Sequence, residues 1–258
     1  MVSATSNEHL GMTMRLALAT MALLGALALA VLMAWERAGW TATITAAAVY
    51  GGVGLLVRRA LRRNPLPRFG AANAITLARA AIAAVLAGAA IESVLWRMPE
   101  SAAGPAQWGI AAAAALIWVV DGVDGWVARR FGQASEFGAR FDMEVDALFI
   151  LALSLMVYAS GRAGAWVLLA GGLRYLFVAA GWAWPALTAP LPPSFRRKAI
   201  CALMGGALVA ATFPPMPEGL GAILLGMGVG TLLWSFGVDT GTLLRRNRME
   251  PTAARIEQ

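Results

Sequence analysis

Four aspartates are the residues of this chain whose type and spacing could do chemistry. Asp121 and Asp124 are three residues apart, and Asp142 and Asp146 are four residues apart. Both spacings place two carboxylates on one face of a helix. Four carboxylates brought together repel one another unless protons or cations intervene. Oxygen-rich sites suit Mg²⁺ or Mn²⁺, and two such ions can neutralise charge on the attacking and leaving oxygens of a phosphoryl group. The spacing therefore predicts a divalent-metal site.

The segments around these aspartates are apolar enough to cross a lipid bilayer. The chain has 258 residues, of which 59% are hydrophobic and 14% are charged. A soluble domain of this size needs far more charged surface, so the composition indicates an integral membrane protein. About 20 apolar residues span a bilayer core, and the sequence predicts eight such helices. They cover residues 14–34, 41–57, 73–95, 106–122, 143–160, 164–184, 198–213 and 219–238.

These helices must bring the two pairs of aspartates together. We expect Asp121 and Asp124 at the end of the fourth helix, and Asp142 and Asp146 at the start of the fifth. Residues 130–141 form a short polar connection between them. Antiparallel packing of the two helices would then place all four carboxylates at one mouth of the bundle.

The basic residues favour one orientation of the helices. Loops rich in Lys and Arg stay in the cytoplasm. The basic clusters follow the second, fourth, sixth and eighth predicted helices, at residues 58–68, 129–140, 196–198 and 245–255. Both termini and the aspartates should therefore face the cytoplasm, and the expected location is a bacterial inner (cytoplasmic) membrane. This placement assigns the net charge of +7 to a membrane face, so we expect no binding of nucleic acid.

The neighbours of the aspartates are also suited to phosphate chemistry. Gly125 and Gly138 would allow a close approach of helices, or of a phosphate to the backbone. Arg129, one turn beyond Gly125, can offer paired donors to a phosphate. Glu144 lies between two of the aspartates in the sequence and is expected to face elsewhere, paired with Arg140 four residues before it.

This stretch resembles the signature of the CDP-alcohol phosphotransferase family, D-x2-D-G-x2-A-R-x8-G-x3-D-x3-D. Its fixed places are filled by Asp121, Asp124, Gly125, Ala128, Arg129, Gly138, Asp142 and Asp146. Upstream, Asn73, Thr76 and Arg79 are similar to the family's N-x-x-T-x-x-R pattern. Ala72 stands where a proline often precedes the asparagine. The resemblance covers about Phe69 to Phe236.

The resemblance implies a six-helix catalytic core, and the hydropathy adds two N-terminal transmembrane helices. The expected fold is therefore all-α, a polytopic transmembrane helical bundle. Residues 1–68 would hold the N-terminal tail, the two extra helices and a basic interfacial segment. Residues 69–240 would form the catalytic core, and residues 241–258 a basic cytoplasmic tail. The two extra helices could cover the core, mediate association or bind a partner, and their composition does not select among these roles.

The resemblance also implies an activity and roles for the site residues. Family members cleave the pyrophosphate of a CDP-linked lipid or alcohol, pass the phosphoryl-bearing group to an acceptor hydroxyl, and release CMP. By that match, Asp121, Asp124 and Asp142 hold one metal ion. Asp121, Asp142 and Asp146 hold the second, and Asp146 is the catalytic base for the acceptor hydroxyl. The residues implied to bind CDP are Asn73, Thr76, Gly125, Ala128, Arg129, Ser135 and Gly138. Family members are commonly homodimers, so we expect a homodimer.

The expected donor is CDP-diacylglycerol, because the site opens at the membrane surface and most members with this topology are, by resemblance, phosphatidyltransferases. The acceptor is predicted from basic residues. Arg174 falls near the middle of the sixth helix, where an unpaired arginine is hard to tolerate. Arg196, Arg197 and Lys198 precede the seventh helix. Together they could bind a phosphorylated polyol such as glycerol 3-phosphate or inositol phosphate. For the last three, an alternative role is to anchor the topology.

Other functions are also compatible with the residues. The same motif fits a non-phosphorylated acceptor such as serine or choline, or a CDP-alcohol donor with a diacylglycerol acceptor. A cation transporter also carries aspartates within the membrane, but near the midplane and on broken helices of repeated halves. This chain shows no such repeat. A catalytically silent scaffold should have lost at least one metal-binding aspartate, and all four are present. The single histidine, His9, lies in the polar N-terminal tail, which argues against histidine-based catalysis.

Overall fold

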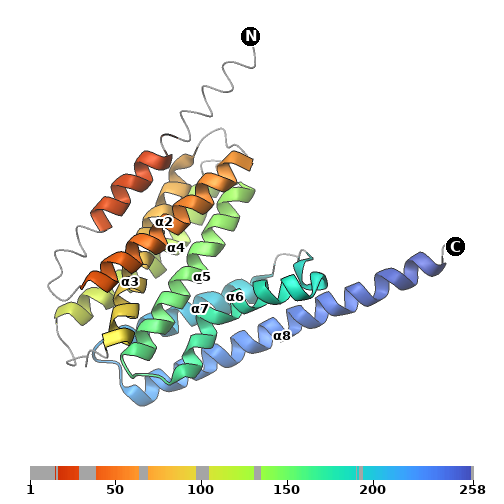
Figure 1. Cartoon of the computed structure of the whole chain (residues 1–258). Helices are drawn as coiled ribbons and strands as arrows, with labels where there is room; N and C mark the ends of the chain where they lie inside the picture. The colour runs from red at the N-terminus through yellow and green to blue at the C-terminus, as the bar shows by residue number, and fades with distance from the viewer. Residues whose placement is uncertain are drawn as a thin grey trace, which may run out of the picture.

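The structure is a computed structural model, and its helices confirm the all-α prediction over the part of the chain that it describes (Figure 1). It describes residues 15, 17–28, 39–63, 69–96, 105–130, 135–189, 191 and 194–256, with the side chains of residues 63, 105–106, 122–129 and 246–256 left out. The predicted N-terminal tail, much of the first predicted helix and residues 64–68 of the basic interfacial segment lie outside the described residues.

The described helices follow one another without an intervening strand. A helical stretch at residues 17–28 comes first. The long helices are α2 (Trp40–Arg63), α3 (Gly70–Trp96), α4 (Pro105–Arg130), α5 (Glu136–Ala159), α6 (Leu168–Ala183), α7 (Phe195–Thr212) and α8 (Glu218–Ile256). Two short 3₁₀ helices, η1 (Ala165–Val167) and η2 (Pro185–Thr188), flank α6.

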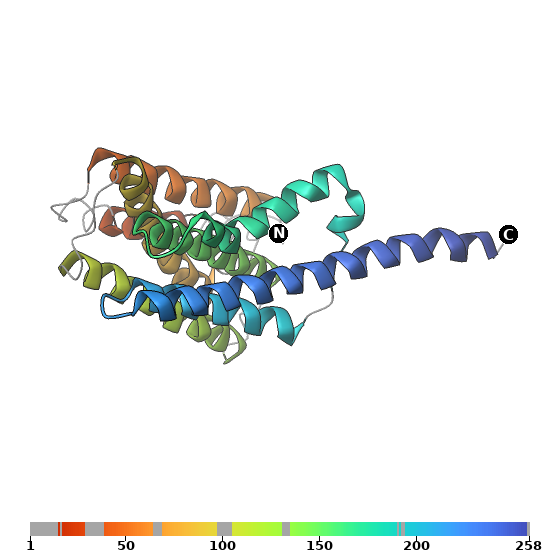
Figure 2. The ribbon, with the colours of Figure 1, turned by 90° about the horizontal axis from the view of Figure 1, so that it is seen from below.

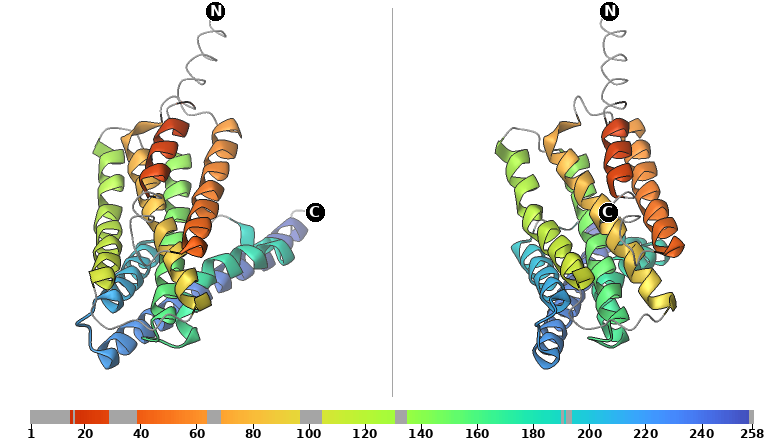
Figure 3. Two further views of the ribbon diagram at one scale, coloured as in Figure 1. Left: turned by 60° about the vertical axis from the view of Figure 1, so that its left-hand side comes forward. Right: turned by 90° about the vertical axis from the view of Figure 1, so that its left-hand side faces the viewer.

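Helix α3 is the centre of the bundle and packs against α2, α4 and α5 (Figure 3). It is rich in alanine, and most of its alanines are buried, which lets neighbouring backbones approach closely. Ala89 and Ala90 of α3 cluster with Met156 near the end of α5, so these two helices run in the same direction. Helices α2, α4 and α5 thus surround α3.

Helix α2 is fixed against α3 from the start of α2 onward. A Cβ atom added at Gly88 of α3 would overlap the carbonyl oxygen of Ala42, so the two backbones touch there. The buried carboxylate of Glu92 accepts a hydrogen bond from the backbone amide of Gly39, at 2.9 Å. This bond satisfies an amide at the N-terminus of α2, where a negative charge is also favoured by the helix dipole. Helix α2 therefore covers one side of the core.

Helices α6 and α8 are inclined to the bundle of α2 to α5, and α8 projects beyond the other helices toward the C-terminus (Figures 1 and 2). A shared core joins the two parts, because Leu153 of α5, Met204 of α7 and Leu225 of α8 are fully buried in one cluster. At the end of α7, Arg162 donates hydrogen bonds to the carbonyl oxygens of Ala211 and Phe213, both at 2.7 Å.

Four of the described helices are long and apolar enough to span a membrane: Trp40–Arg62, Gly70–Trp96, Ala165–Ala183 and Glu218–Arg245. Within the described residues, Gln107–Asp121 of α4 is a shorter apolar stretch, and α5 and α7 occupy other predicted spans without being among these four. Large apolar side chains such as Ile44, Leu176 and Met227 are exposed on the outer faces of α2, α6 and α8. Such exposure is expected of helices that face lipid.

The contact between α5 and α6 gives the first prediction. A Cβ added at Gly171 of α6 would overlap the backbone of Leu151, whereas one added at the neighbouring Gly172 would meet no atom within 4 Å. Overpacking costs about 1–3 kcal/mol, whereas replacing glycine by alanine in a helix gains about 1 kcal/mol. Gly171→Ala should therefore lower the thermal unfolding temperature in detergent, and Gly172→Ala should leave it unchanged or raise it. Equal unfolding temperatures for the two variants would contradict the close contact.

Candidate active site

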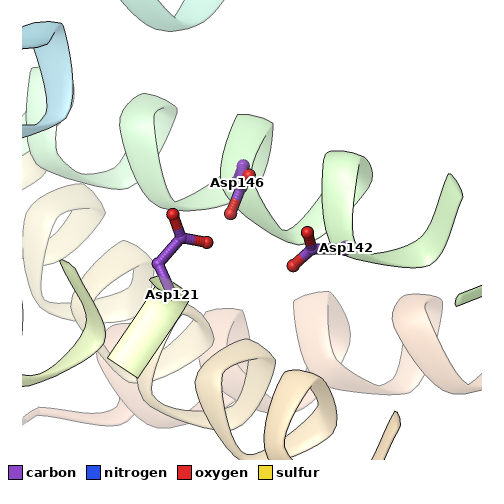
Figure 4. A group of neighbouring side chains, drawn as sticks. All are labelled: Asp121, Asp142 and Asp146. Carbon is purple, nitrogen blue, oxygen red and sulfur yellow. The ribbon is translucent and has the colours of Figure 1, made fainter. Parts of the chain in front are cut away.

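Three of the four aspartates converge where α4 and α5 pack around α3. Asp121 comes from α4, and Asp142 and Asp146 come from successive turns of α5. One carboxylate oxygen of each lies within 4.8 Å of the others, and Figure 4 shows the three side chains turned toward a common space. The side chains are 36–39% exposed, so small solutes can reach them. The side chain of Asp124 is outside the described part of α4.

The prediction that these aspartates lie at helix ends is wrong. Helix α4 continues to Arg130 and α5 already begins at Glu136, so the aspartates lie about two turns inside their helices. A hydropathy pattern detects apolar length, whereas backbone hydrogen bonding continues through polar residues. Ser135 caps α5, because its side-chain oxygen accepts a hydrogen bond from the amide of Gly138 at 3.0 Å.

Arg79 of α3 contacts all three carboxylates. Its Nη1 donates a hydrogen bond to Oδ1 of Asp142 at 2.7 Å, and its Nη2 donates to Oδ1 of Asp121 and of Asp146. Arg79 is only 2% exposed, so a buried cation compensates part of the negative charge of this cluster. Sequence reasoning matched Arg79 to a family pattern but gave it no role. A basic residue within an apolar helix, needing a counter-ion, was the signal that could have found it.

The residues expected to bind CDP lie partly at the start of α3. Asn73 and Thr76 are both buried. The Asn73 side-chain amide donates to the carbonyl oxygen of Phe69 at 2.6 Å, and the Thr76 hydroxyl donates to that of Ala72 at 3.1 Å. Both side chains therefore bond to a backbone carbonyl four residues earlier, that of Phe69 lying just before α3.

Gly138 brings the start of α5 close to Asn73. A Cβ added at Gly138 would lie 3.0 Å from Oδ1 of Asn73 and 3.1 Å from Oγ of Ser135, which is tighter than ordinary packing. The structure thus places Asn73, Ser135 and Gly138 together. The other expected CDP contacts are Gly125, Ala128 and Arg129. They lie in residues 122–129 of α4, whose side chains the structure does not describe.

Arg174 is paired, contrary to the argument that an unpaired arginine marks the acceptor pocket. Its Nη2 and Nε donate to the two carboxylate oxygens of Glu144, the Nε bond being 3.3 Å long. The expected Glu144–Arg140 pair is also wrong, because Arg140 binds Glu136 at 2.6 Å. Glu136 and Glu144 are each four residues from Arg140, but Glu144 lies on the side of α5 where it meets Arg174 of α6.

Arg196 and Arg197 converge on Asp239 of α8. Arg196 donates to Oδ1 of Asp239 at 2.5 Å and to the carbonyl oxygen of Ser235 at 3.1 Å, and its guanidinium lies over the Trp234 ring. Arg197 donates to the same Asp239 oxygen at 3.4 Å. These bonds join the start of α7 to α8. Sequence reasoning missed Asp239, although an acidic residue at the end of an apolar span required a basic partner.

Lys198, the fourth residue expected to bind the acceptor, lies on the same first turn of α7 and is exposed. The three arginines are therefore distributed over two ion-paired groups, Arg174 between α5 and α6 and Arg196 with Arg197 between α7 and α8. Neither group contains a contact to the three aspartates among the ion pairs of the described residues.

Comparison with known proteins supports a family assignment. A family model described as CDP-alcohol phosphatidyltransferase matches residues 69–234, which is more than half of the chain. Searches of curated proteins and of solved structures found no match. The matched range begins just before α3 and ends within α8, so it contains Arg79 and the three converging aspartates. The chain belongs to the CDP-alcohol phosphatidyltransferase family.

Proposed function

We propose that this protein transfers the phosphatidyl group of CDP-diacylglycerol to a hydroxyl of a phosphorylated polyol and releases CMP. Its family makes it an enzyme of phosphatidyl transfer, a transferase of substituted phosphate groups. Its apolar helices, together with the family, make it an integral membrane protein. The observation that carries the proposal is the meeting of three carboxylates from α4 and α5 within 4.8 Å.

The donor atoms of this cluster fit Mg²⁺ or Mn²⁺. Asp121, Asp142 and Asp146 offer only carboxylate oxygens, which these hard cations prefer. We propose that two ions bind here, with Asp124 as the fourth ligand on the strength of the family resemblance. When bound, they would neutralise negative charge on the phosphoryl oxygens.

The protein's own residues would position the substrates and move one proton. Asp146 takes the proton of the acceptor hydroxyl while the acceptor oxygen forms a bond to the phosphatidyl phosphorus. The bond from that phosphorus to the CMP oxygen breaks, and CMP leaves with its electron pair. Asn73, Thr76, Gly125, Ala128, Arg129, Ser135 and Gly138 would hold the CDP moiety. In-line transfer of this kind depends on positioning and charge compensation and requires no covalent enzyme intermediate.

The basic residues of α6 and α7 support an anionic acceptor. Arg174 pairs with Glu144, Arg196 and Arg197 share Asp239, and Lys198 is exposed beside them on the first turn of α7. Positive charge therefore remains in excess among these described groups. Such an excess suits a phosphate, since arginine binds phosphate through paired, charge-assisted hydrogen bonds. Serine and choline, the alternative acceptors, carry no phosphate that could bind to this excess positive charge.

We further propose that the enzyme works as a homodimer in a bacterial inner membrane with its site facing the cytoplasm. The support for this orientation is the distribution of arginine and lysine along the sequence, since the basic clusters fall on the side of the aspartates. The support for a dimer is the family resemblance.

The first test identifies the product lipid. Purified protein is incubated with labelled CDP-diacylglycerol, Mg²⁺ and separate acceptors: glycerol 3-phosphate, inositol phosphate, serine and choline. A phosphorylated polyol should give labelled lipid and CMP, EDTA should stop the reaction, and excess Mg²⁺ should restore it. Product with serine or choline alone, or transfer from a CDP-alcohol to diacylglycerol, would replace the proposed substrates. Cation uptake into vesicles without any transfer would instead indicate a transporter.

The second test removes one carboxylate without changing its size. Asp142→Asn should abolish transfer, because it removes a proposed metal ligand. It should leave the protein folded, because asparagine has nearly the same volume as aspartate. The matched control is Glu136→Gln on the same helix, whose surface pair with Arg140 should contribute less than about 1 kcal/mol. Labelled-lipid transfer and size-exclusion behaviour are measured for both variants. Normal turnover by Asp142→Asn would remove Asp142 from the active site.

The third test separates acceptor binding by Arg174 from its pairing with Glu144. Arg174→Ala should raise the KM for a phosphorylated acceptor more than the KM for the donor. Glu144→Gln removes the carboxylate partner but keeps the arginine, so it should leave the acceptor KM unchanged or lower it. If both variants raise the acceptor KM equally, the pair holds α5 to α6 and does not bind the acceptor.

A further inference from the structure

We propose that Arg79 is a positioning residue, a counter-cation built into α3 that holds Asp121, Asp142 and Asp146 together before divalent ions bind and gives up contacts as they bind. This inference rests on the proposed function, because it takes the three aspartates as the ligands of those ions. It goes further because the proposed function uses Arg79 neither as a metal ligand nor as a contact to the donor or acceptor substrate.

The contacts of Arg79 single it out. Two nitrogen atoms of one guanidinium reach Oδ1 of three carboxylates that come from two different helices. Arginine can do this because its planar fork presents several donors in fixed directions, whereas lysine is a single point charge. The third helix, α3, thus fixes the relative positions of α4 and α5 at the height of the candidate site.

Burial shows the direction from which ions can arrive. Arg79 is 2% exposed, whereas the three aspartate side chains are 36–39% exposed. The guanidinium therefore lies on the inner side of the cluster, and the carboxylates open outward. An ion can reach the outer side without first removing Arg79 from the core.

Charge explains why such a residue is needed. Carboxylates within 4.8 Å of one another repel strongly where water is partly excluded. One arginine compensates one of the three charges, so the cluster is held together yet remains negative enough to attract divalent ions. A cluster without Arg79 would separate until ions or water screened the repulsion.

The same geometry makes Arg79 and the ions competitors. Arg79 binds Oδ1 of each carboxylate, and a divalent ion would draw its ligands from the same three carboxylates. Ion binding should therefore replace part of what Arg79 does in the ion-free protein. The contribution of Arg79 to stability should then be large without ions and small with them, whereas the contribution of a merely structural arginine should not change.

The experiment compares thermal unfolding of the full-length protein in detergent, with EDTA and with saturating Mn²⁺. Arg79→Met keeps an unbranched apolar chain and removes the charged guanidinium. In EDTA it should unfold at least about 5 °C below the wild type, and in Mn²⁺ this gap should shrink by half or more. Arg79→Lys, which keeps the charge but not the fork, should lie between them in EDTA.

The matched control is Arg162→Met. Arg162 binds only carbonyl oxygens at the end of α7 in its described hydrogen bonds, and it makes none to the aspartates. Its effect on the unfolding temperature should be equal in EDTA and in Mn²⁺. Direct Mn²⁺ titration, followed by electron paramagnetic resonance, checks that each variant binds the ion.

The outcomes distinguish this inference from the function on which it rests. If the difference in unfolding temperature between the wild type and Arg79→Met is the same in EDTA and in Mn²⁺, the role of Arg79 is overturned. The metal site still stands in that case, provided that the wild type binds Mn²⁺. Wild-type protein that binds no Mn²⁺ overturns the metal site, and the inference with it. If Arg79→Met folds only when Mn²⁺ is present, the inference is supported, and Arg79→Lys supplies the unfolding temperature in EDTA.

Discussion

The compensation of three carboxylates by one buried arginine is the interaction on which the rest of this structure depends. Asp121, Asp142 and Asp146 come from two helices, and Arg79 comes from a third. The buried arginine would be costly without these carboxylates, and the carboxylates would repel one another more strongly without the arginine. The three helices must therefore keep their relative rotation and height, and the packing of α3 against α4 and α5 provides this.

Small residues make that packing possible. The buried alanines of α3 keep its surface narrow, and glycines occur where another helix comes closest, as at Gly88 against Ala42 and at Gly138 against Asn73. The same principle holds α6 to α5 at Gly171. Because a membrane offers little hydrophobic driving force between helices, close van der Waals contact of this kind must supply much of their association.

The sequence predicted the number, order and approximate positions of the described helices, because the length of each apolar run can be measured from the hydropathy of the residues. It also predicted that Asp121 would meet Asp142 and Asp146. It could not predict the ends of α4 and α5, since helix geometry continues past the apolar stretch until a cap such as Ser135. It also gave the wrong partner for Glu144 and none for Arg79, because contacts between helices depend on their rotation about their axes. Spacing within one helix does not contain that information.

The carboxylate of Glu92 at the start of α2 has a consequence for where an autonomous folding unit can begin. Similarity to the family begins at residue 69, which lies after α2. A protein trimmed to that boundary would lose the Gly39 amide that binds the Glu92 carboxylate, and it would uncover the surface of α3 around Gly88. The boundary found by sequence similarity therefore separates two helices that tertiary contacts join, and a fragment that keeps the Glu92–Gly39 bond must include the start of α2.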